Sequence, residues 1–291
     1  MQRADSTVTS GAPPDSPGDG GFTTIAHRGF AGVFPENTLE AVRGSTTGGS
    51  VPSAGMVEID VMPSAEGVPV VFHDGTLDRV TDADPSRQGQ AVWETPLDEL
   101  RSLDVLDSGQ PIPLLEEVVE ALPASVALNA ELKHPGVDPG PEGLLTQDAL
   151  KRSRRDWRPF VDRVLALVGA SGHDLLVSSF FEGALGAVRD ADPDVPLAAV
   201  LSDSIEDGFT VARRHDCEAV HVPRNMVPGT PLFDEAYVAG PYEPVDVVAR
   251  AHREGRLVNV WTIETPEHAA AFAGTAVDGL ITDVPLDTMV R

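Results

Sequence analysis

Short apolar runs rich in β-branched residues recur along the chain, and each is bounded by Gly, Pro, Asp or Asn. Such runs are typical of buried strands. They predict strands at Thr23–His27, Met56–Val61, Pro69–His73, Val126–Lys133, Leu175–Phe180, Pro196–Leu201, Ala219–Pro223, Leu257–Ile263 and Gly279–Thr282.

Apolar residues at helical spacing lie between most of these strands. One helix is predicted to begin at Asn37 or Thr38, either of which suits an N-cap, and another carries Pro266 in its first turn. Further helices are predicted within Leu114–Leu122, Phe160–Val168, Ile205–His215, Pro244–Glu254 and Pro266–Phe272. Strands that alternate with helices predict a parallel α/β sheet, and their number suits a closed (β/α)8 TIM barrel.

Two segments depart from this alternation. Val61 to Pro69 is too short for a crossover helix, so the second and third strands form either a hairpin or a parallel pair joined by an extended loop. Residues 74–111 are turn-rich and predict a small insertion after the third strand. Residues 134–159 predict a loop insertion whose first part is rich in Pro and Gly and whose second part is basic. Nine candidate strands for eight barrel positions imply that one is peripheral, and the pattern does not say which.

Composition narrows the class of protein. The formal net charge is −25, and of 21 basic residues only Lys133 and Lys151 are lysines. A surface this acidic disfavours nucleic acid and anionic membranes. The same composition is typical of a halophilic cytoplasmic protein, and codon bias in a GC-rich genome is the second explanation.

Targeting signals are not evident in this sequence. Residues 1–21 are rich in Ser, Thr, Gly, Pro and Asp without an apolar core, so they predict a disordered leader before a single domain at 22–291. Cys217 is the single cysteine, which excludes an intramolecular disulfide. No apolar run is long enough to span a bilayer, so we expect no stable membrane anchoring and a cytoplasmic location by default. The oligomeric state is left open.

Charged residues gather where the predicted strands end, which in a parallel barrel is the active face. Side chains alternate across a strand, so both carboxylates of Glu58-x-Asp60 face one way, as do the charges of Glu131-x-Lys133. The three carboxylates suit a hard divalent cation, Mg²⁺ or Ca²⁺. The remaining strand ends carry His27-Arg28, His73-Asp74 and Trp261-Thr262.

These residues also predict phosphate chemistry. Arg28 and Lys133 offer a forked donor and a point charge to a phosphate. His27 and His73 form a pair suited to proton transfer near neutral pH. A single strand-end histidine is more often structural, and a Glu-x-Asp pair often accepts a salt bridge. Their joint occurrence at successive strand ends favours one pocket that binds a metal and a phosphate.

The ordered motifs resemble those of the glycerophosphodiester phosphodiesterases, whose chemistry is related to that of the phosphatidylinositol-specific phospholipases C. The matching residues are His27-Arg28-Gly29, Pro35-Glu36-Asn37-Thr38, Val57–Val61, Val70–Asp74, Leu77–Thr81, Ile112–Glu117, Glu131–Lys133, Ser178–Phe180, Trp261-Thr262 and Asp278–Pro285. The resemblance implies a TIM barrel with a small insertion after its third strand.

The resemblance also implies roles for individual residues. Glu58, Asp60 and Glu131 would hold one divalent cation, and His27 and His73 would be the acid/base pair. Arg28 and Lys133 would bind the phosphate, and Trp261 would line the place of the glycerol. The activity implied is hydrolysis of a small-molecule glycerophosphodiester to sn-glycerol 3-phosphate and an alcohol.

The sequence departs from the family pattern at Glu264, where Asn is usual, and at Val284, where Arg is common. Both positions bear on which alcohol the mouth accepts. Three other functions stay open: a phospholipase C- or D-type enzyme acting on intact lipids, a non-catalytic barrel that binds a phosphate ligand, and a metal-dependent sugar-active barrel. An apolar rim would indicate the lipid-active enzyme, and the loss of a histidine or carboxylate would indicate the binding barrel. An enzyme that ignores phosphodiesters would be the sugar-active barrel.

Overall fold

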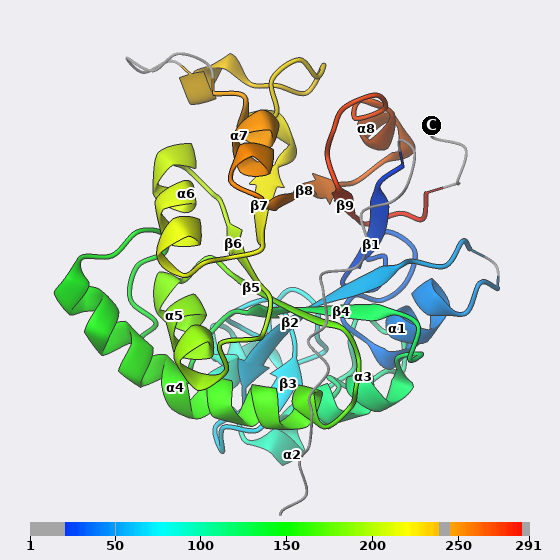
Figure 1. Ribbon diagram of the computed structural model, residues 1–291. Coiled ribbons are helices and arrows are strands. Elements are labelled where there is room, and N and C mark those ends of the chain that lie inside the picture. Colours follow the sequence, from blue (N-terminus) through cyan, green and yellow to red (C-terminus); the bar gives the residue numbers. More distant parts are fainter. Residues whose placement is uncertain (1–20, 50, 239–244, 287–291) are drawn as a thin grey trace, which may run out of the picture.

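The computed structural model describes residues 21–49, 51–238 and 245–286 (Figure 1). Within these residues, eight parallel strands close into a barrel in the order β1-β9-β8-β7-β6-β5-β4-β2, with β1 paired to β2. The strands are β1 (Thr23–His27), β2 (Met56–Pro63), β3 (Pro69–Val71), β4 (Ala127–Leu132), β5 (Leu175–Ser179), β6 (Leu197–Val200), β7 (Ala219–Pro223), β8 (Leu257–Ile263) and β9 (Gly279–Thr282). The TIM barrel prediction is confirmed. The predicted leader lies almost wholly outside the described residues.

The peripheral strand is β3, which pairs antiparallel with β2 through Val61↔Val71 and Pro63↔Pro69. The hairpin is therefore the correct alternative for these two strands, and no helix separates them. The turn is tight: the Ser64 amide donates to the Val68 carbonyl at 2.9 Å, and Gly67 takes a φ of 76° that favours glycine.

Helices surround the barrel (Figure 1). They are α1 (Leu39–Thr46), α2 (Leu97–Leu100), α3 (Leu115–Ala121), α4 (Gln147–Gly169), α5 (Glu182–Ala191), α6 (Ile205–Arg214), α7 (Val247–Arg253) and α8 (Pro266–Ala270). Thr38, one of the two proposed caps, accepts a hydrogen bond from the Ala41 amide at 3.2 Å and begins α1. The sequence pattern did not reveal α5, because its residues 182–188 are all buried and present no polar face to mark a helical period.

The predicted loop insertion at 134–159 is wrong from Gln147 onward, because α4 begins there and continues through Pro159. Thr146 caps this helix, and Trp157 and Phe160 carry its buried face across the proline. The basic residues at its start are the exposed side of an amphipathic helix, which the sequence reading took for a solvated loop. Residues 134–146 do remain irregular, as predicted.

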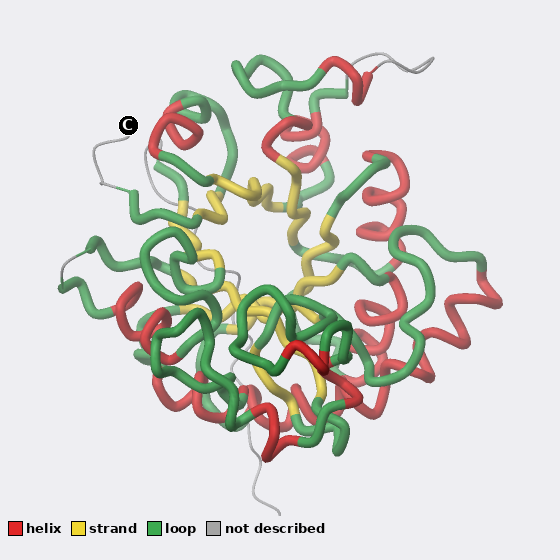
Figure 2. Tube along the Cα trace, turned by 180° about the vertical axis from the view of Figure 1, so that it is seen from behind, coloured by secondary structure: helices red, strands yellow, loops and turns green. Residues whose placement is uncertain are grey.

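The insertion at 74–111 contains only short helical turns and α2. Its apolar side chains form a small core of their own against the hairpin, made of Met62, Val70, Phe72, Leu77, Val80, Val92, Leu100, Val105 and Ile112. Figure 2 shows the ring of strands from behind, with loops and short helices lying across part of its opening. The insertion is thus a packed cover beside the barrel mouth.

Inside the barrel, apolar side chains fill the end where the strands begin. The plug consists of Ile25, Met56, Ala127, Leu176, Ala198, Ala219 and Ile281. Farther along β2 and β4 the inward positions become Glu58, Asp60, Asn129 and Glu131, which are polar. This change in polarity along the barrel axis places the pocket at the carboxyl ends of the strands.

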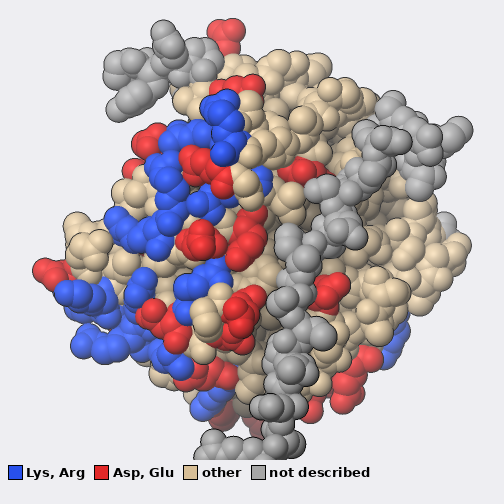
Figure 3. Space-filling model, in the orientation of Figure 1, with Lys and Arg blue, Asp and Glu red and all other residues tan. Residues whose placement is uncertain are grey.

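Many basic side chains on the surface lie beside acidic ones. Lys and Arg gather on the side of the molecule that α4 and α6 form, and acidic residues lie between them (Figure 3). Glu206 of α6, for example, contacts Arg213 at 3.2 Å and Arg250 of α7 at 2.8 Å. No helix among the described residues is long and apolar enough to cross a membrane.

Candidate active site at the carboxyl ends of the strands

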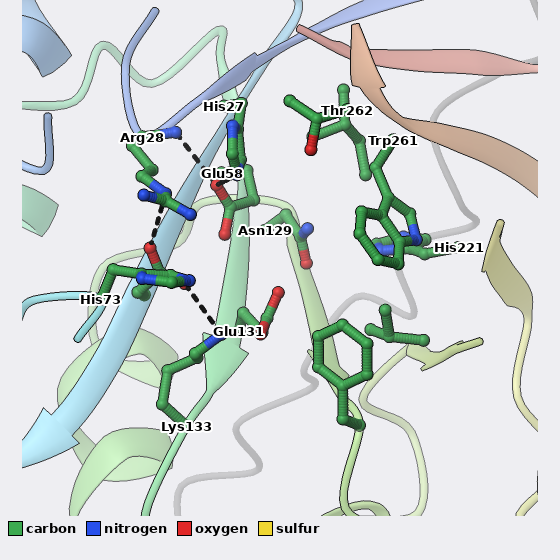
Figure 4. Close-up of a pocket in the computed structure, with 14 residues that line it drawn as sticks. His27, Arg28, Glu58, His73, Asn129, Glu131, Lys133, His221, Trp261 and Thr262 are labelled. Carbon is green, nitrogen blue, oxygen red and sulfur yellow. Dashed lines mark hydrogen bonds and ion pairs between the residues drawn. The ribbon is translucent and has the colours of Figure 1, made fainter. Parts of the chain in front are cut away.

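One pocket brings together all eight residues that the sequence singled out, and Figure 4 shows its lining side chains. The eight are His27, Arg28, Glu58, Asp60, His73, Glu131, Lys133 and Trp261. Six further residues line the same pocket: Asn129, Phe180, Val200, His221, Thr262 and Ile281. The polar members come from β1, β2, β4, β7 and β8 or from the loops that follow strands.

Three carboxylates form the acidic side of the pocket. Oxygen atoms of Glu58, Asp60 and Glu131 lie within 4.8 Å of one another, and Glu58 and Asp60 are only 2% and 1% exposed. Burial, and then the negative charges of Asp60 and Glu131, raise the pKa of Glu58 well above its ordinary value. The Oε1 atom of Glu58 is buried without a hydrogen-bond partner. An oxygen-only set with a buried unpaired carboxylate oxygen fits a hard divalent cation.

Asp60 is held as a carboxylate by its neighbours. Burial alone would favour its neutral form, but the charges of Lys133 and Arg28 outweigh burial and lower its pKa. The Asn37 amide donates to Asp60 Oδ2 at 2.9 Å, and the Asp60 backbone amide donates to Asn37 Oδ1 at 3.2 Å. Asn37 thus fixes Asp60, a role that the sequence did not reveal, since it marked Asn37 only as a candidate helix N-cap.

Two cations face these carboxylates. Lys133 Nζ donates to Glu131 Oε1 at 2.6 Å and lies 3.6 Å from Asp60 Oδ1. Burial lowers the pKa of Lys133, but the charges of Glu131 and Asp60 outweigh this and raise it. Arg28 Nε lies 3.3 Å from Asp60 Oδ2. Both side chains therefore remain charged, and both border the pocket where an anion would enter.

Both histidines are oriented by an aspartate. His27 Nδ1 lies 2.6 Å from Asp283 Oδ1, and His73 Nδ1 lies 2.6 Å from Asp74 Oδ1. An ionised carboxylate can only accept, so Nδ1 donates in both pairs and each ring's other nitrogen is left for the pocket. Neither aspartate was assigned a site role from the sequence. The signal was present for Asp74, which directly follows His73.

Arg79, from the insertion, connects two parts of the site. Its guanidinium donates to Asp74 at 2.6 and 2.8 Å and to Glu36 at 2.7 and 2.8 Å. Asp74 in turn orients His73, and Glu36 accepts from Arg28 NH1 at 2.9 Å. The guanidinium and the His73 ring hold the pKa of Asp74 at about 2, although burial alone would raise it. One exposed arginine therefore contacts both the aspartate that orients His73 and the glutamate that pairs with Arg28.

The backbone after β1 is bent to make this possible. Arg28 has a φ of 51° and Gly29 a φ of 76°. A Cβ atom at Gly29 would lie 2.7 Å from the backbone carbon of Ala41, so only glycine fits against α1 there. The bend turns the Arg28 amide toward the pocket, where it donates to Glu58 Oε2 at 3.0 Å.

An aromatic wall completes the pocket. The rings of Phe180 and Trp261 meet edge to face with centroids 5.6 Å apart. Arg224 donates to the Thr262 carbonyl behind Trp261 and pairs with Glu264 at 2.8 Å. Glu264, one of the two unusual positions in the sequence, is thus engaged with Arg224 and is not among the lining residues.

Comparisons with known proteins extend over almost the whole chain. A family model described as the glycerophosphoryl diester phosphodiesterase family matches residues 27–287. A glycerophosphodiester phosphodiesterase from Bacillus altitudinis is 26% identical over 274 residues, which is 90% of this chain and 94% of that protein. A probable glycerophosphodiester phosphodiesterase 2 from Mycobacterium tuberculosis is 27% identical, covering 91% and 88%.

Solved structures agree with these matches. The structure of a phosphodiesterase from Oleispira antarctica in complex with the product sn-glycerol-3-phosphate is 28% identical, with a TM-score of 0.67 over 90% of this chain and 93% of that one. A putative glycerophosphoryl diester phosphodiesterase from Silicibacter pomeroyi is 26% identical, with a TM-score of 0.68 over 91% and 90%.

Proposed function

The chain belongs to the glycerophosphoryl diester phosphodiesterase family, and from that premise we propose that it hydrolyses small glycerophosphodiesters to sn-glycerol 3-phosphate and an alcohol. The observation that carries the proposal is the pocket itself. Three carboxylates, two cations and two histidines with aspartate partners all lie in one pocket. A protein that only binds a phosphate ligand would need the two basic side chains but not two histidines oriented for proton transfer.

Glu58, Asp60 and Glu131 would hold a single divalent cation, Mg²⁺ or Ca²⁺, as three oxygen ligands. Such an ion supplies Lewis-acid stabilisation of charge on a phosphoryl oxygen and favours deprotonation of a bound hydroxyl. The buried, unpaired Oε1 atom of Glu58 supports the assignment.

Arg28 and Lys133 would bind the phosphoryl oxygens, because both are charged, border the pocket and project beside the carboxylates. Bound there, the phosphorus would lie within reach of the two histidines that line the same pocket. Trp261 would pack against the glycerol through its ring, which forms the wall with Phe180.

His27 and His73 would move the protons. One ring nitrogen takes the proton of the attacking hydroxyl as its oxygen bonds to phosphorus, and the other histidine gives a proton to the alkoxide whose bond to phosphorus breaks. The attacking group is either water or the hydroxyl of the substrate's own glycerol. In the second case a cyclic phosphate forms first, and water then opens it with the two proton roles reversed.

The histidine roles are tested by His27→Ala and His73→Ala, each of which should lower kcat on glycerophosphocholine by roughly 10²- to 10⁴-fold. His252→Ala is a matched control, since His252 also pairs with an aspartate, Asp278, at 2.8 Å, but outside the pocket. Near-normal turnover in either pocket variant, with the control also normal, would remove that histidine from the acid/base pair.

The metal assignment is tested by calorimetric titration of Mg²⁺ and Ca²⁺ into the protein and into Glu58→Gln. The variant should lose affinity for the ion. Glu206→Gln, a surface substitution with the carboxylate 67% exposed, should not. Turnover should also cease after chelation and return with added ion, and full turnover after exhaustive chelation would reject the metal-dependent mechanism.

A further inference from the structure

Asn129 and His221 form what we call the polar floor of the pocket, and the mechanism above assigns no role to either side chain. Asn129 is fully buried, at 0% exposure, and lines the pocket. Neither its amide oxygen nor its amide nitrogen has a hydrogen-bond partner within the described part of the chain. Buried amides are almost always satisfied, so both unpaired atoms point to a missing ligand.

Asn129 lies between the carboxylates and the aromatic wall of the pocket (Figure 4). In the β2–β4 ladder it is the direct partner of Glu58, and it precedes Glu131 by two residues on the same face of β4. Figure 4 shows its amide group directed toward the part of the pocket where Trp261 and His221 lie. A ligand that reaches the carboxylates and extends toward Trp261 therefore passes this amide.

His221 contributes a second neutral polar group to the same floor. The amide nitrogen of Asn259 lies 3.2 Å from His221 Nε2. An amide NH₂ can only donate, so Nε2 accepts and the ring proton is on Nδ1. Burial lowers the pKa of His221 to about 3, which keeps the ring uncharged at neutral pH. His221 is thus a hydrogen-bonding group here and not a proton carrier.

We infer that Asn129 binds a hydroxyl group of the substrate's glycerol half, with His221 beside it completing a neutral floor for that glycerol. The inference rests on the proposed function and adds a specificity-determining residue to it. A hydroxyl both donates and accepts, which matches an amide with both atoms free, whereas a phosphoryl oxygen would satisfy only the nitrogen. The absence of formal charge on Asn129 and His221 also suits an uncharged polyol.

The position of the polar floor indicates that the glycerol half of the substrate, and not the leaving alcohol, lies against it. Directly beneath Asn129 and His221 the barrel is closed by the apolar plug that includes Ala127, Ala198 and Ala219. A leaving group of variable size needs an open side of the pocket. The closed floor therefore favours the small group common to all glycerophosphodiesters.

The test compares two ligands that differ only in their hydroxyls, sn-glycerol 3-phosphate and propyl phosphate. By calorimetry with the divalent cation present, the wild-type protein should bind the first at least about tenfold more tightly. Asn129→Leu, which keeps the size of the side chain but removes the amide, should reduce this ratio to about twofold or less. Asn225→Leu is the control, an asparagine outside the pocket lining, and should keep the wild-type ratio.

Failures of the two proposals are separable. A wild-type protein that hydrolyses no glycerophosphodiester would reject the proposed function. A wild-type protein that does so, together with an Asn129→Leu variant that keeps the full ratio, would overturn only the inference. Equal weakening of both ligands, with reduced cation affinity, would make Asn129 a metal ligand and also overturn it.

A direct measurement needs no variant and is unaffected if Asn129→Leu folds poorly. A crystal structure of the wild-type protein with sn-glycerol 3-phosphate should place a glycerol hydroxyl within about 3.2 Å of an Asn129 amide atom. A water molecule at that place, with the glycerol bound elsewhere, would refute the assignment.

Discussion

Arg79 allows a sharp test of how the insertion supports the barrel. Its four contacts, at 2.6 to 2.8 Å, join Asp74, which orients His73, to Glu36, which pairs with Arg28. Replacing it by methionine keeps the length of the side chain and removes the guanidinium. Asp74 would then orient His73 without its cationic partner.

The size of the effect follows from exposure and geometry. A charge-assisted hydrogen bond contributes about 1.5–3 kcal/mol, but the Arg79 side chain is 48% exposed and solvent screening reduces that figure. A coupling of about 1.4 kcal/mol between Arg79 and Asp74 is a reasonable expectation, and it corresponds to roughly tenfold in rate. Arg79→Met should therefore lower kcat/KM about tenfold or more.

The assay is a double-mutant cycle on glycerophosphocholine with Arg79→Met, Asp74→Asn and the double variant. If Arg79 acts through Asp74, replacing Arg79 in the Asp74→Asn variant should lower kcat/KM by only about threefold or less. Arg79→Lys should recover part of the loss in kcat, since it restores charge without the fork.

Arg101→Met is the matched control. Arg101 also belongs to the insertion and makes a two-pronged pair with Glu117 at 2.7 and 2.8 Å, away from the pocket. It should lower the thermal unfolding temperature without changing kcat/KM. Strictly additive effects of Arg79→Met and Asp74→Asn, or an equal loss in Arg101→Met, would refute the proposed support of His73.

Two predictions concern folding stability. Gly29→Ala should destabilise the fold by about 2–4 kcal/mol in urea unfolding, because the new methyl group meets Ala41 and the φ of 76° disfavours it; an unchanged midpoint would contradict the close packing of that bend. Glu182→Gln should lower the free energy of unfolding by about 3 kcal/mol near pH 7, since the fully buried carboxylate accepts a hydrogen bond from Arg214 at 2.6 Å and contacts His215 at 3.1 Å. Burial alone would raise the pKa of Glu182, but the hydrogen bond from His215 and the charge of Arg214 lower it, so the stabilisation is present above the ordinary carboxyl range and is lost as the pH falls through the lowered pKa. The unfolding free energies of wild type and variant should therefore converge in acid, and a constant difference down to pH 3 would argue against an ionised Glu182.

Local sequence signals predicted most of the fold. The barrel strands were evident because each is a short apolar run, and the eight site residues because each lies on a strand or within two residues after one. The predicted loop insertion at 134–159 was wrong over 147–159 because Pro and basic residues there resembled a loop, while the packing of Trp157 and Phe160 sustains the helix across Pro159. Packing between elements overrode a local signal there.

The parts of the site that sequence did not reveal act through contacts between distant segments. Asn37 reaches Asp60 across 23 positions, Arg79 reaches Glu36 across 43, and Asp283 reaches His27 across 256. All three side chains lie in motifs that the sequence shares with the family, but nothing local shows which distant side chain each of them contacts. Asn129 was missed for a different reason, since an uncharged amide inside an apolar strand resembles an ordinary core position until its unpaired atoms are seen.

The contact between His27 and Asp283 has a consequence for how activity appears during folding. His27 ends the first strand of the barrel, Asp283 follows the last, and β1 and β9 are neighbours that close the ring. A chain that has formed every strand but the last has its three carboxylates and the two basic side chains beside them, yet its first histidine lacks the aspartate that orients it. Turnover should therefore require closure of the ring, and in refolding experiments it should rise only once β9 has docked beside β1.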